Sequence, residues 1–270
     1  MGLYTTILTL STASSYVGAI YFFIPQDLKS KDRNDLDVVK FRIGRILKLS
    51  LFLLLLLPNL VEGGYFNNIR FLGVLPGYSL SDSLTIDLFN VFKTLYFILM
   101  LYSSSIYQIL LGELDLFDDD DDKTWLHISR DYILGPITEE LIYRGLIMMI
   151  LKNNNNNNNN DTLYRLSPFL FGIAHLHHGI QLYFQGHKLM EIFIVCGFQL
   201  LYTSIFGMVS LMFYHGYMNN LWACIVLHSV CNLFGIPSFH VESKKMWVRV
   251  VYYFLIFFGI VHSFIFVKTL

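Results

Sequence analysis

The chain has 270 residues, of which 54% are hydrophobic and only 14% are charged, and its net charge at pH 7 is −1. A soluble domain usually carries about 25% charged residues, so this composition argues against a soluble protein and indicates an integral membrane protein. The balanced charge gives no reason to expect nucleic acid as a partner. The cysteines, Cys196, Cys224 and Cys231, lie in apolar runs without a CxxC pair, so we expect packed thiols.

Apolar segments recur along the whole chain, and a helix needs about 20 mostly apolar residues to cross a membrane. The segments cover residues 3–24, 43–61, 87–112, 130–151, 166–184, 189–214, 217–236 and 247–268. Histidines and glycines interrupt 166–184 and 217–236, which makes these two the weakest spans. The first segment lacks the basic start and the cleavage site of a signal peptide, so we expect it to stay as a spanning helix. The prediction is an all-α, polytopic membrane protein of about 7–8 transmembrane helices in one domain, residues 1–270.

The segments between these spans are polar. The loop QDLKSKDRNDLDVVKFRIGRILK, residues 26–48, is rich in lysine and arginine, and the positive-inside rule places it in the cytoplasm. Two low-complexity runs, Asp118–Asp122 and Asn153–Asn160, cannot bury apolar surface, and we interpret them as disordered loops without a chemical role. The second run ends in a glycosylation sequon at Asn160, which matters only if that loop is lumenal.

The sequence EELIYR, residues 139–144, places charges inside a predicted span. Ionisable groups inside a membrane are costly and therefore indicate function. Glu140 and Arg144 are four residues apart, so they share a helix face and can pair. Glu139 lies about 100° round the helix axis, on the face of Tyr143. Arg144 would then hold Glu140 ionised and leave Glu139 free to act on a substrate. The simpler alternative is an ion pair at a helix end that reaches interfacial water.

Two further polar clusters lie in other predicted spans. In FGIAH, residues 171–175, His175 follows Phe171 by four positions and lies deeper in its apolar run than the two histidines after it, which suit an interfacial position. In HSVCN, residues 228–232, His228 and Asn232 are four apart and share a face. The asparagine alone would suit a hydrogen bond between helices. A histidine one turn before it favours a paired donor site.

Together these groups suit hydrolysis of an amide by water. A glutamate can deprotonate the water and a histidine can orient it. A second histidine and an amide can donate hydrogen bonds to the oxyanion that forms on the carbonyl. The sequence contains no GxSxG elbow and no HExxH zinc motif. Because glutamate and histidine are zinc ligands, a metal bound by residues from separate helices stays open.

The three motifs, in this order, resemble those of the type II CAAX prenyl endopeptidases, also called Ras-converting enzymes. These enzymes belong to a wider group of intramembrane proteins with EExxxR, FxxxH and HxxxN motifs. The surrounding words RDYILGPITEELIYRG and FGIAHLHHG are similar to the eukaryotic prenyl-protease branch. The resemblance covers residues 125–236, whereas the N-terminal spans match only in hydrophobic layout. The poly-Asn run between the first two motifs departs from the family.

The resemblance implies removal of the last three residues from prenylated CaaX proteins, such as small GTPases, at the endoplasmic reticulum membrane. It implies that Glu139 and His175 activate the water and that His228 and Asn232 form the oxyanion site. Glu140, Arg144 and Phe171 would support them. We expect no cofactor, with zinc left open, and membrane lipid as a further partner.

Three alternatives to this function fit the same residues. The first is a non-catalytic scaffold of the same superfamily, and the second is a metal-dependent version of the protease. The third is a transporter that uses the charges as a proton relay.

A helix that is apolar all round usually faces lipid, so the aromatic run YYFLIFF, residues 252–258, is interpreted as lipid-facing.

Overall fold

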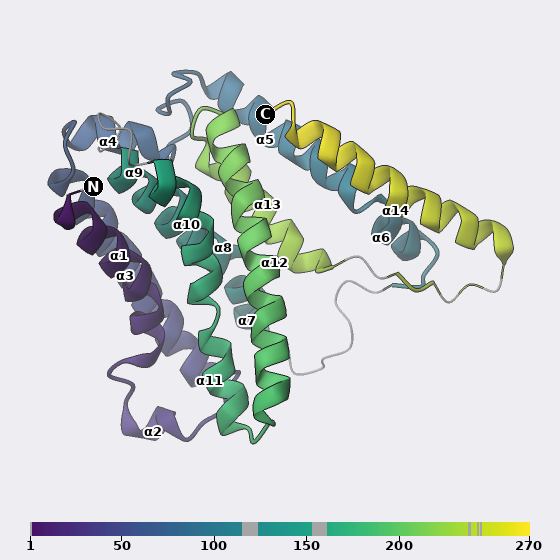
Figure 1. Cartoon of the computed structure of the whole chain (residues 1–270), viewed down its shortest axis with the longest axis horizontal. Coiled ribbons are helices and arrows are strands. Elements are labelled where there is room, and N and C mark those ends of the chain that lie inside the picture. Colours follow the sequence, from purple (N-terminus) through teal and green to yellow (C-terminus); the bar gives the residue numbers. More distant parts are fainter. Residues whose placement is uncertain (1, 115–123, 153–160, 237–238, 242, 244) are drawn as a thin grey trace.

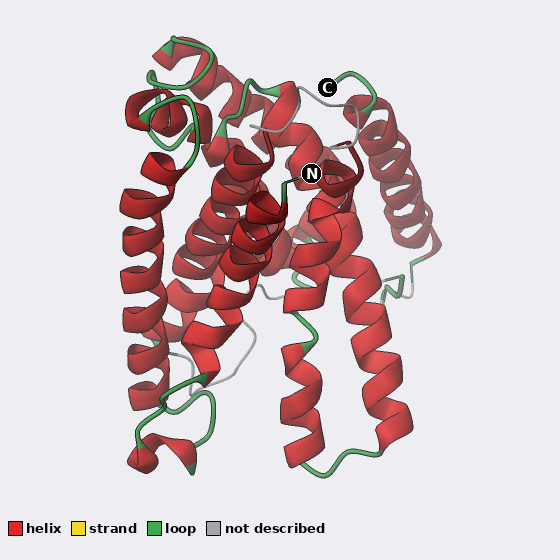
Figure 2. Ribbon diagram, turned by 60° about the vertical axis from the view of Figure 1, so that its left-hand side comes forward, coloured by secondary structure: helices red, strands yellow, loops and turns green. Residues whose placement is uncertain are grey.

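The computed structural model describes residues 2–114, 124–152, 161–236, 239–241, 243 and 245–270, and for residues 161–165 it describes the backbone alone. Every regular element in these ranges is helical (Figure 2), which confirms the predicted all-α class. Both low-complexity runs and the sequon at Asn160 lie outside the described residues.

The helices follow one another with short connections. In chain order they are α1 (Leu3–Tyr21), α2 (Gln26–Lys29), α3 (Leu36–Leu60), α4 (Tyr65–Leu72), α5 (Leu84–Leu101), α6 (Ser103–Leu110), α7 (Trp125–Ser129), η1 (Arg130–Leu134), α8 (Gly135–Glu140), η2 (Leu141–Leu146), α9 (Ile147–Lys152), α10 (Asp161–Ala174), α11 (His177–Phe184), α12 (Leu189–Gly216), α13 (Leu221–Phe234) and α14 (Met246–Val267); η1 and η2 are π-helical. In Figure 1, α1 and α3 lie side by side at one edge, α10 and α12 pass through the middle, and α5 and α14 form the opposite edge.

Four helices of the described part, α3, α5, α12 and α14, are long and apolar enough to cross a membrane, and α13 is a shorter apolar helix. Two predicted spans are divided. Residues 87–112 form α5 and α6, and residues 166–184 form α10 and α11. The second break follows from tight turns after Ala174, where the amides of His175 and Leu176 bond back over only three residues. The predicted number of 7–8 spans stays a prediction.

The segment that carries the first motif lies at the centre of the molecule. The elements η1, α8, η2 and α9 form one continuous helical run, and all residues from Glu140 to Leu151 are buried. Helices α1, α3, α4, α10, α12 and α13 pack around this run. A helix that is apolar on all sides is stable when it is enclosed, and here the other helices enclose it. The wide turns of η2 carry Arg144 of the first motif, and π-helical segments frequently occur at functional sites.

Close backbone contact joins α10 to α12. A Cβ atom at Gly172 would lie 2.3 Å from Ser204 Oγ, and one at Gly207 would lie 3.2 Å from Pro168 Cα. Small residues at such crossings allow helices in membranes to approach closely. The second motif, on α10, is therefore held tightly against α12.

Candidate active site

Glu140 is the centre of a fully buried polar group. Its Oε2 forms an ion pair with Arg144 Nε at 3.1 Å and accepts a hydrogen bond from Ser210 Oγ at 2.8 Å. Its Oε1 lies 2.7 Å from His228 Nδ1, on α13. The predicted pairing of Glu140 with Arg144 is present. A buried ion needs a partner for its charge and its hydrogen bonds. Glu140 therefore serves to hold Arg144, Ser210 and His228 in place.

Arg144 is held partly by aromatic rings. Its guanidinium carbon lies 4.2 Å from the ring centroid of Phe171 and 5.4 Å from that of Phe206. Its two terminal nitrogens are buried and make no hydrogen bond within the described part of the chain. A guanidinium is weakly hydrated and stacks on aromatic faces, so the rings replace water as its surroundings. Phe171, which belongs to the second motif, thus also packs against the arginine of the first motif.

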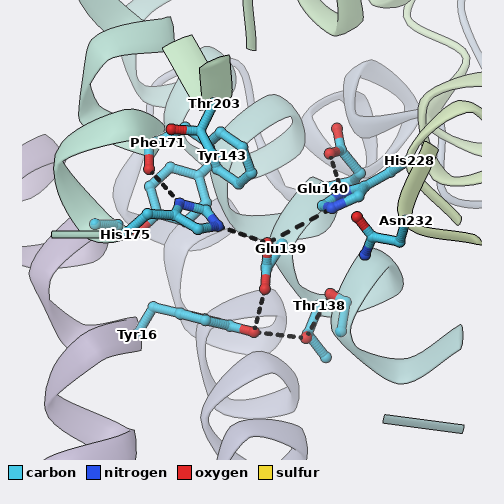
Figure 3. Close-up of polar contacts among 12 residues, drawn as sticks. Tyr16, Thr138, Glu139, Glu140, Tyr143, Phe171, His175, Thr203, His228 and Asn232 are labelled. Carbon is cyan, nitrogen blue, oxygen red and sulfur yellow. Dashed lines mark hydrogen bonds and ion pairs between the residues drawn. The ribbon is translucent and has the colours of Figure 1, made fainter. Parts of the chain in front are cut away.

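Glu139 has a different environment from its neighbour. Its side chain is 19% exposed, and among the described residues no lysine or arginine pairs with it. Tyr16, on α1, donates its hydroxyl to Oε1 at 3.2 Å. The Nε2 atoms of His175 and His228 each lie 3.9 Å from Oε2 (Figure 3). The two adjacent glutamates therefore have different surroundings, as their positions on the helix predict, although His228 contacts both.

The orientation of His175 explains the spacing of its motif. Helix α10 ends at Ala174, so the carbonyl of Phe171 lacks the amide partner that a longer helix would provide. His175 Nδ1 lies 2.8 Å from this carbonyl and donates to it, because a carbonyl oxygen can only accept. In the neutral ring, Nε2 then carries the lone pair and faces Glu139. The ring also packs edge-on against Phe171, with centroids 4.5 Å apart.

His228 is oriented by the same principle. Its Nδ1 donates to the Glu140 carboxylate, so its Nε2 faces Glu139. Asn232 lies one turn further along α13, and its Nδ2 donates to the carbonyl of Asp131 at 2.9 Å. The structure thus brings Glu139, His175 and His228 together, while Asn232 is bonded to η1.

A cavity of about 450 Å³ opens beside these groups. Glu139, His175 and Asn232 line one part of it. This volume lies in the usual range of ligand pockets, about 300–1,000 Å³. The remaining walls come from α1, the loop before α3, α3 itself, η1 and α11, including Tyr16, Tyr21, Arg33, Val39, Arg42, Ile43, Ile46, Arg130, His177, His178 and Gln181.

Tyr16 and Ser210 contact the two glutamates, and motif reading alone does not find them. A weak signal exists for each. In α1, buried Thr5, Thr9, Thr12 and Tyr16 recur at helical spacing, and in α12 the buried positions Thr203, Gly207, Ser210 and Tyr214 do the same. Small or polar residues on one face of an apolar helix mark contact with other helices.

The arrangement of the side chains at this site bears on metal binding. Within the described residues, no group of three or more His, Cys, Asp or Glu side chains has the arrangement of a metal site. The separations of 3.9 Å exceed the roughly 3.4 Å between ligands that tetrahedral zinc with bonds of about 2.1 Å requires. The donor types are nevertheless those that zinc prefers. The expected absence of a metal therefore stays a prediction.

The three cysteines are free; Cys224 and Cys231 are buried and Cys196 is half-buried, so they are packed thiols as expected.

Comparison with known proteins supports the motif reading. Residues 121–234 match the model of the family described as Type II CAAX prenyl endopeptidase Rce1-like. The chain is 31% identical over 112 residues to CAAX prenyl protease 2 of Saccharomyces cerevisiae, a match that covers 40% of this chain and 36% of the relative. It is 32% identical over 121 residues to the protein of that name from Arabidopsis thaliana, covering 44% and 38%. For the Homo sapiens protein the values are 32% over 119 residues, covering 43% and 34%.

The matches thus span only 34% to 38% of the length of these relatives. No solved structure matches the chain. In its motif region, the chain resembles the type II CAAX prenyl endopeptidases, as its three motifs predict.

Proposed function

We propose that this protein is an intramembrane endopeptidase that removes the C-terminal tripeptide from prenylated CaaX proteins. The observation that carries the proposal is the arrangement at Glu139. This carboxylate has no charged lysine or arginine partner in the described part of the chain, borders a cavity and faces two oriented imidazoles. Relatives named CAAX prenyl protease 2 match this region.

The nucleophile is a water molecule between Glu139 and His175. The 3.9 Å between Glu139 Oε2 and His175 Nε2 suits one water, because hydrogen bonds of about 2.8 Å to both atoms would meet at about 90°. Both atoms accept, so the water donates its two hydrogens and directs a lone pair into the cavity. Glu139 takes one proton as the water attacks, as a general base does.

The attack forms a bond between the water oxygen and the carbonyl carbon of the prenylated cysteine. The carbonyl electrons move onto oxygen, and the negative charge needs donors. His228 can donate through Nε2 only as an imidazolium, because its Nδ1 hydrogen is already given to Glu140. Glu140 is then its counter-ion. Asn232 has a second amide hydrogen besides the one bonded to Asp131.

Collapse of the intermediate breaks the carbon–nitrogen bond. Glu139 returns its proton to the leaving amine, so the products are a prenylated cysteine with a carboxyl group and a free tripeptide. Arg144 and Ser210 take no part in proton transfer. They hold Glu140, which positions His228, while Phe171 positions His175.

A membrane location suits this substrate. A prenyl chain partitions into lipid with about 0.8 kcal/mol per buried CH₂, so the membrane concentrates it near the site. The four long apolar helices support an embedded protein. The resemblance points to the endoplasmic reticulum and to substrates such as small GTPases.

The test is cleavage of a farnesylated CaaX peptide by the purified protein in lipid vesicles. We expect release of the tripeptide only from the prenylated peptide, and loss of release in Glu139→Gln. The same substitution at the exposed Glu191 is the matched control. Cleavage that persists in Glu139→Gln would refute Glu139 as the base. If the wild-type protein cleaves no peptide, the result favours the scaffold. If it cleaves no peptide but carries protons across the vesicle membrane in a way that depends on these charged residues, the result favours the transporter.

The metal-dependent alternative has one observation in its favour. Both imidazoles have their Nδ1 hydrogens engaged, so in the neutral rings their Nε2 lone pairs converge on Glu139, an arrangement typical of metal-bound histidines. The test is elemental analysis of the purified protein before and after exhaustive chelation. Stoichiometric zinc whose removal and return track activity would overturn the metal-free mechanism.

A further inference from the structure

The cavity has a cationic wall in addition to its catalytic one. Arg33, Arg42 and Arg130 all line it, on the loop before α3, on α3 itself and on η1. In Figure 1, α2, the beginning of α3 and α11 lie at one end of the molecule. Only two acidic residues, Glu139 and Asp131, line the cavity within the described part of the chain. Positive charge therefore exceeds negative charge there.

The three arginines are not equivalent. Arg130 is neutralised by Asp131, which accepts from its Nε at 2.6 Å and its Nη2 at 3.0 Å. Arg33 donates to Gln181 Oε1 at 3.1 Å, which is a neutral partner. Arg42 makes no hydrogen bond or ion pair with any described residue, and its Nε is buried without a partner. A buried donor without an acceptor is unfavourable, so this geometry favours an incoming anion.

A continuous row of neighbouring side chains connects this wall to the proposed base. His175 faces Glu139 at 3.9 Å, and Arg42 lies 5.6 Å from the ring centroid of Tyr21. Between these ends the ring centroids follow one another at 6.2 Å (His175 to His178), 4.1 Å (His178 to His177) and 5.3 Å (His177 to Tyr21). Glu139 and Arg42 thus lie beside the two ends of this row of four rings.

The wall of α1 and α3 beside this row is apolar. It consists of Ile20, Val39, Ile43, Ile46 and Leu47. The cavity therefore presents a base, an apolar wall and uncompensated cations.

We propose that Arg33 and Arg42 bind the free C-terminal carboxylate of the substrate; this inference rests on the proposed peptidase function. A CaaX end presents a scissile carbonyl, two aliphatic residues and a carboxylate, and three extended residues span about 10 Å. Arginine binds carboxylates through two parallel hydrogen bonds. The arginines would then select substrates that end in a free carboxylate. They would also place the scissile peptide bond, which precedes the last three residues, beside Glu139.

The experiment compares two farnesylated peptides of one sequence, one with a free C-terminal carboxylate and one with a C-terminal amide. For the wild type we expect kcat/KM to be about 10- to 100-fold higher for the acid, which is the range for hydrogen bonds to a charged group. Arg42→Gln, and to a smaller extent Arg33→Gln, should lower kcat/KM for the acid and leave it unchanged for the amide. Arg42→Lys should retain part of the preference.

Lys40→Gln is the matched control, because Lys40 is exposed on the same helix and lies outside the cavity. It should leave both substrates unchanged. Equal loss for acid and amide in Arg42→Gln would overturn the inference and indicate a structural role. A loss that appears only in vesicles with anionic lipid, and equally for both peptides, would assign the arginines to lipid phosphate. If the wild type cleaves neither peptide, the proposed function itself fails; if it cleaves both without preference, only this inference fails.

Discussion

The segment η2–α9 and the helix α14 are both apolar enough to be predicted as membrane spans, yet their surroundings are opposite. From Leu141 to Leu151, every residue of η2–α9 is buried by other helices. In α14 only Val248, Tyr252, Ile256 and Gly259 are buried. Phenylalanines such as Phe254 and Phe257 are 63% and 68% exposed. The enclosed segment contains a motif arginine, whereas α14 has no Asp, Glu, Lys or Arg between Arg249 and Lys268.

This difference shows what hydrophobicity does and does not indicate. It identifies the protein class, because both segments are apolar, but it does not distinguish a lipid-facing helix from an enclosed one. The ionisable residues make that distinction. Glu140 and Arg144 are stable only where other helices supply donors, acceptors and rings, so their presence marks the enclosed segment.

The largest expected effect on activity is at Glu139. Glu139→Gln removes the proposed base and should lower kcat by about 10² to 10⁴, the usual contribution of general base catalysis. The side chain is partly exposed and pairs with no lysine or arginine of the described residues, so thermal stability in lipid nanodiscs should stay within about 1 kcal/mol of wild type. A variant that unfolds instead would mean that both glutamates are structural.

Glu140→Ala should lower the stability of the protein strongly, whereas Glu139→Gln should not. It leaves Arg144 buried without its carboxylate, and breaking such a pair costs about 3–5 kcal/mol. We therefore expect a clear decrease in melting temperature together with loss of cleavage, because His228 also loses its acceptor. Unchanged stability would show that the enclosed segment does not depend on this pair.

The sequence predicts the faces of single helices better than the contacts between helices. The spacing of Glu140 and Arg144 predicts their pair, and the position of Glu139 predicts its separation from it. The bond from His228 to Glu140 depends on how α13 crosses α8, which no spacing within one helix encodes. The break after Ala174 was likewise missed, because the apolar run continues past the point where the helix ends.

A smaller effect is expected from Tyr16→Phe. The variant removes the hydroxyl that donates to Glu139 Oε1 but keeps the ring packed against Tyr143. A hydrogen bond to a charged group contributes about 1.5–3 kcal/mol, so kcat/KM should fall by about tenfold or more while the fold is retained. Thr9→Val, on the same buried face of α1, is the control. An equal loss in both variants would indicate packing of α1 rather than the hydroxyl.

The smallest effect is expected on α14. Phe257→Leu changes an exposed apolar residue to another, so unfolding free energy should change by no more than about 0.5 kcal/mol and cleavage should be unchanged. The measurement is the melting temperature and kcat/KM in nanodiscs. A strong loss of cleavage with normal stability would show that this face of α14 contacts substrate, which would break the contrast with η2–α9.

The glycine contacts between α10 and α12 couple the positions of His175 and Ser210, which contact different glutamates of the site. His175 follows α10 and Ser210 lies on α12, and these helices touch at Gly172, where a methyl group would clash with Ser204, and at Gly207, where it would be tight against Pro168. The two helices are therefore expected to move as one body, and a displacement of this pair relative to α8 changes the approach of His175 to Glu139 and that of Ser210 to Glu140 together. The geometry of the proposed catalytic water and that of the hydrogen bond from Ser210 to Glu140 therefore change together.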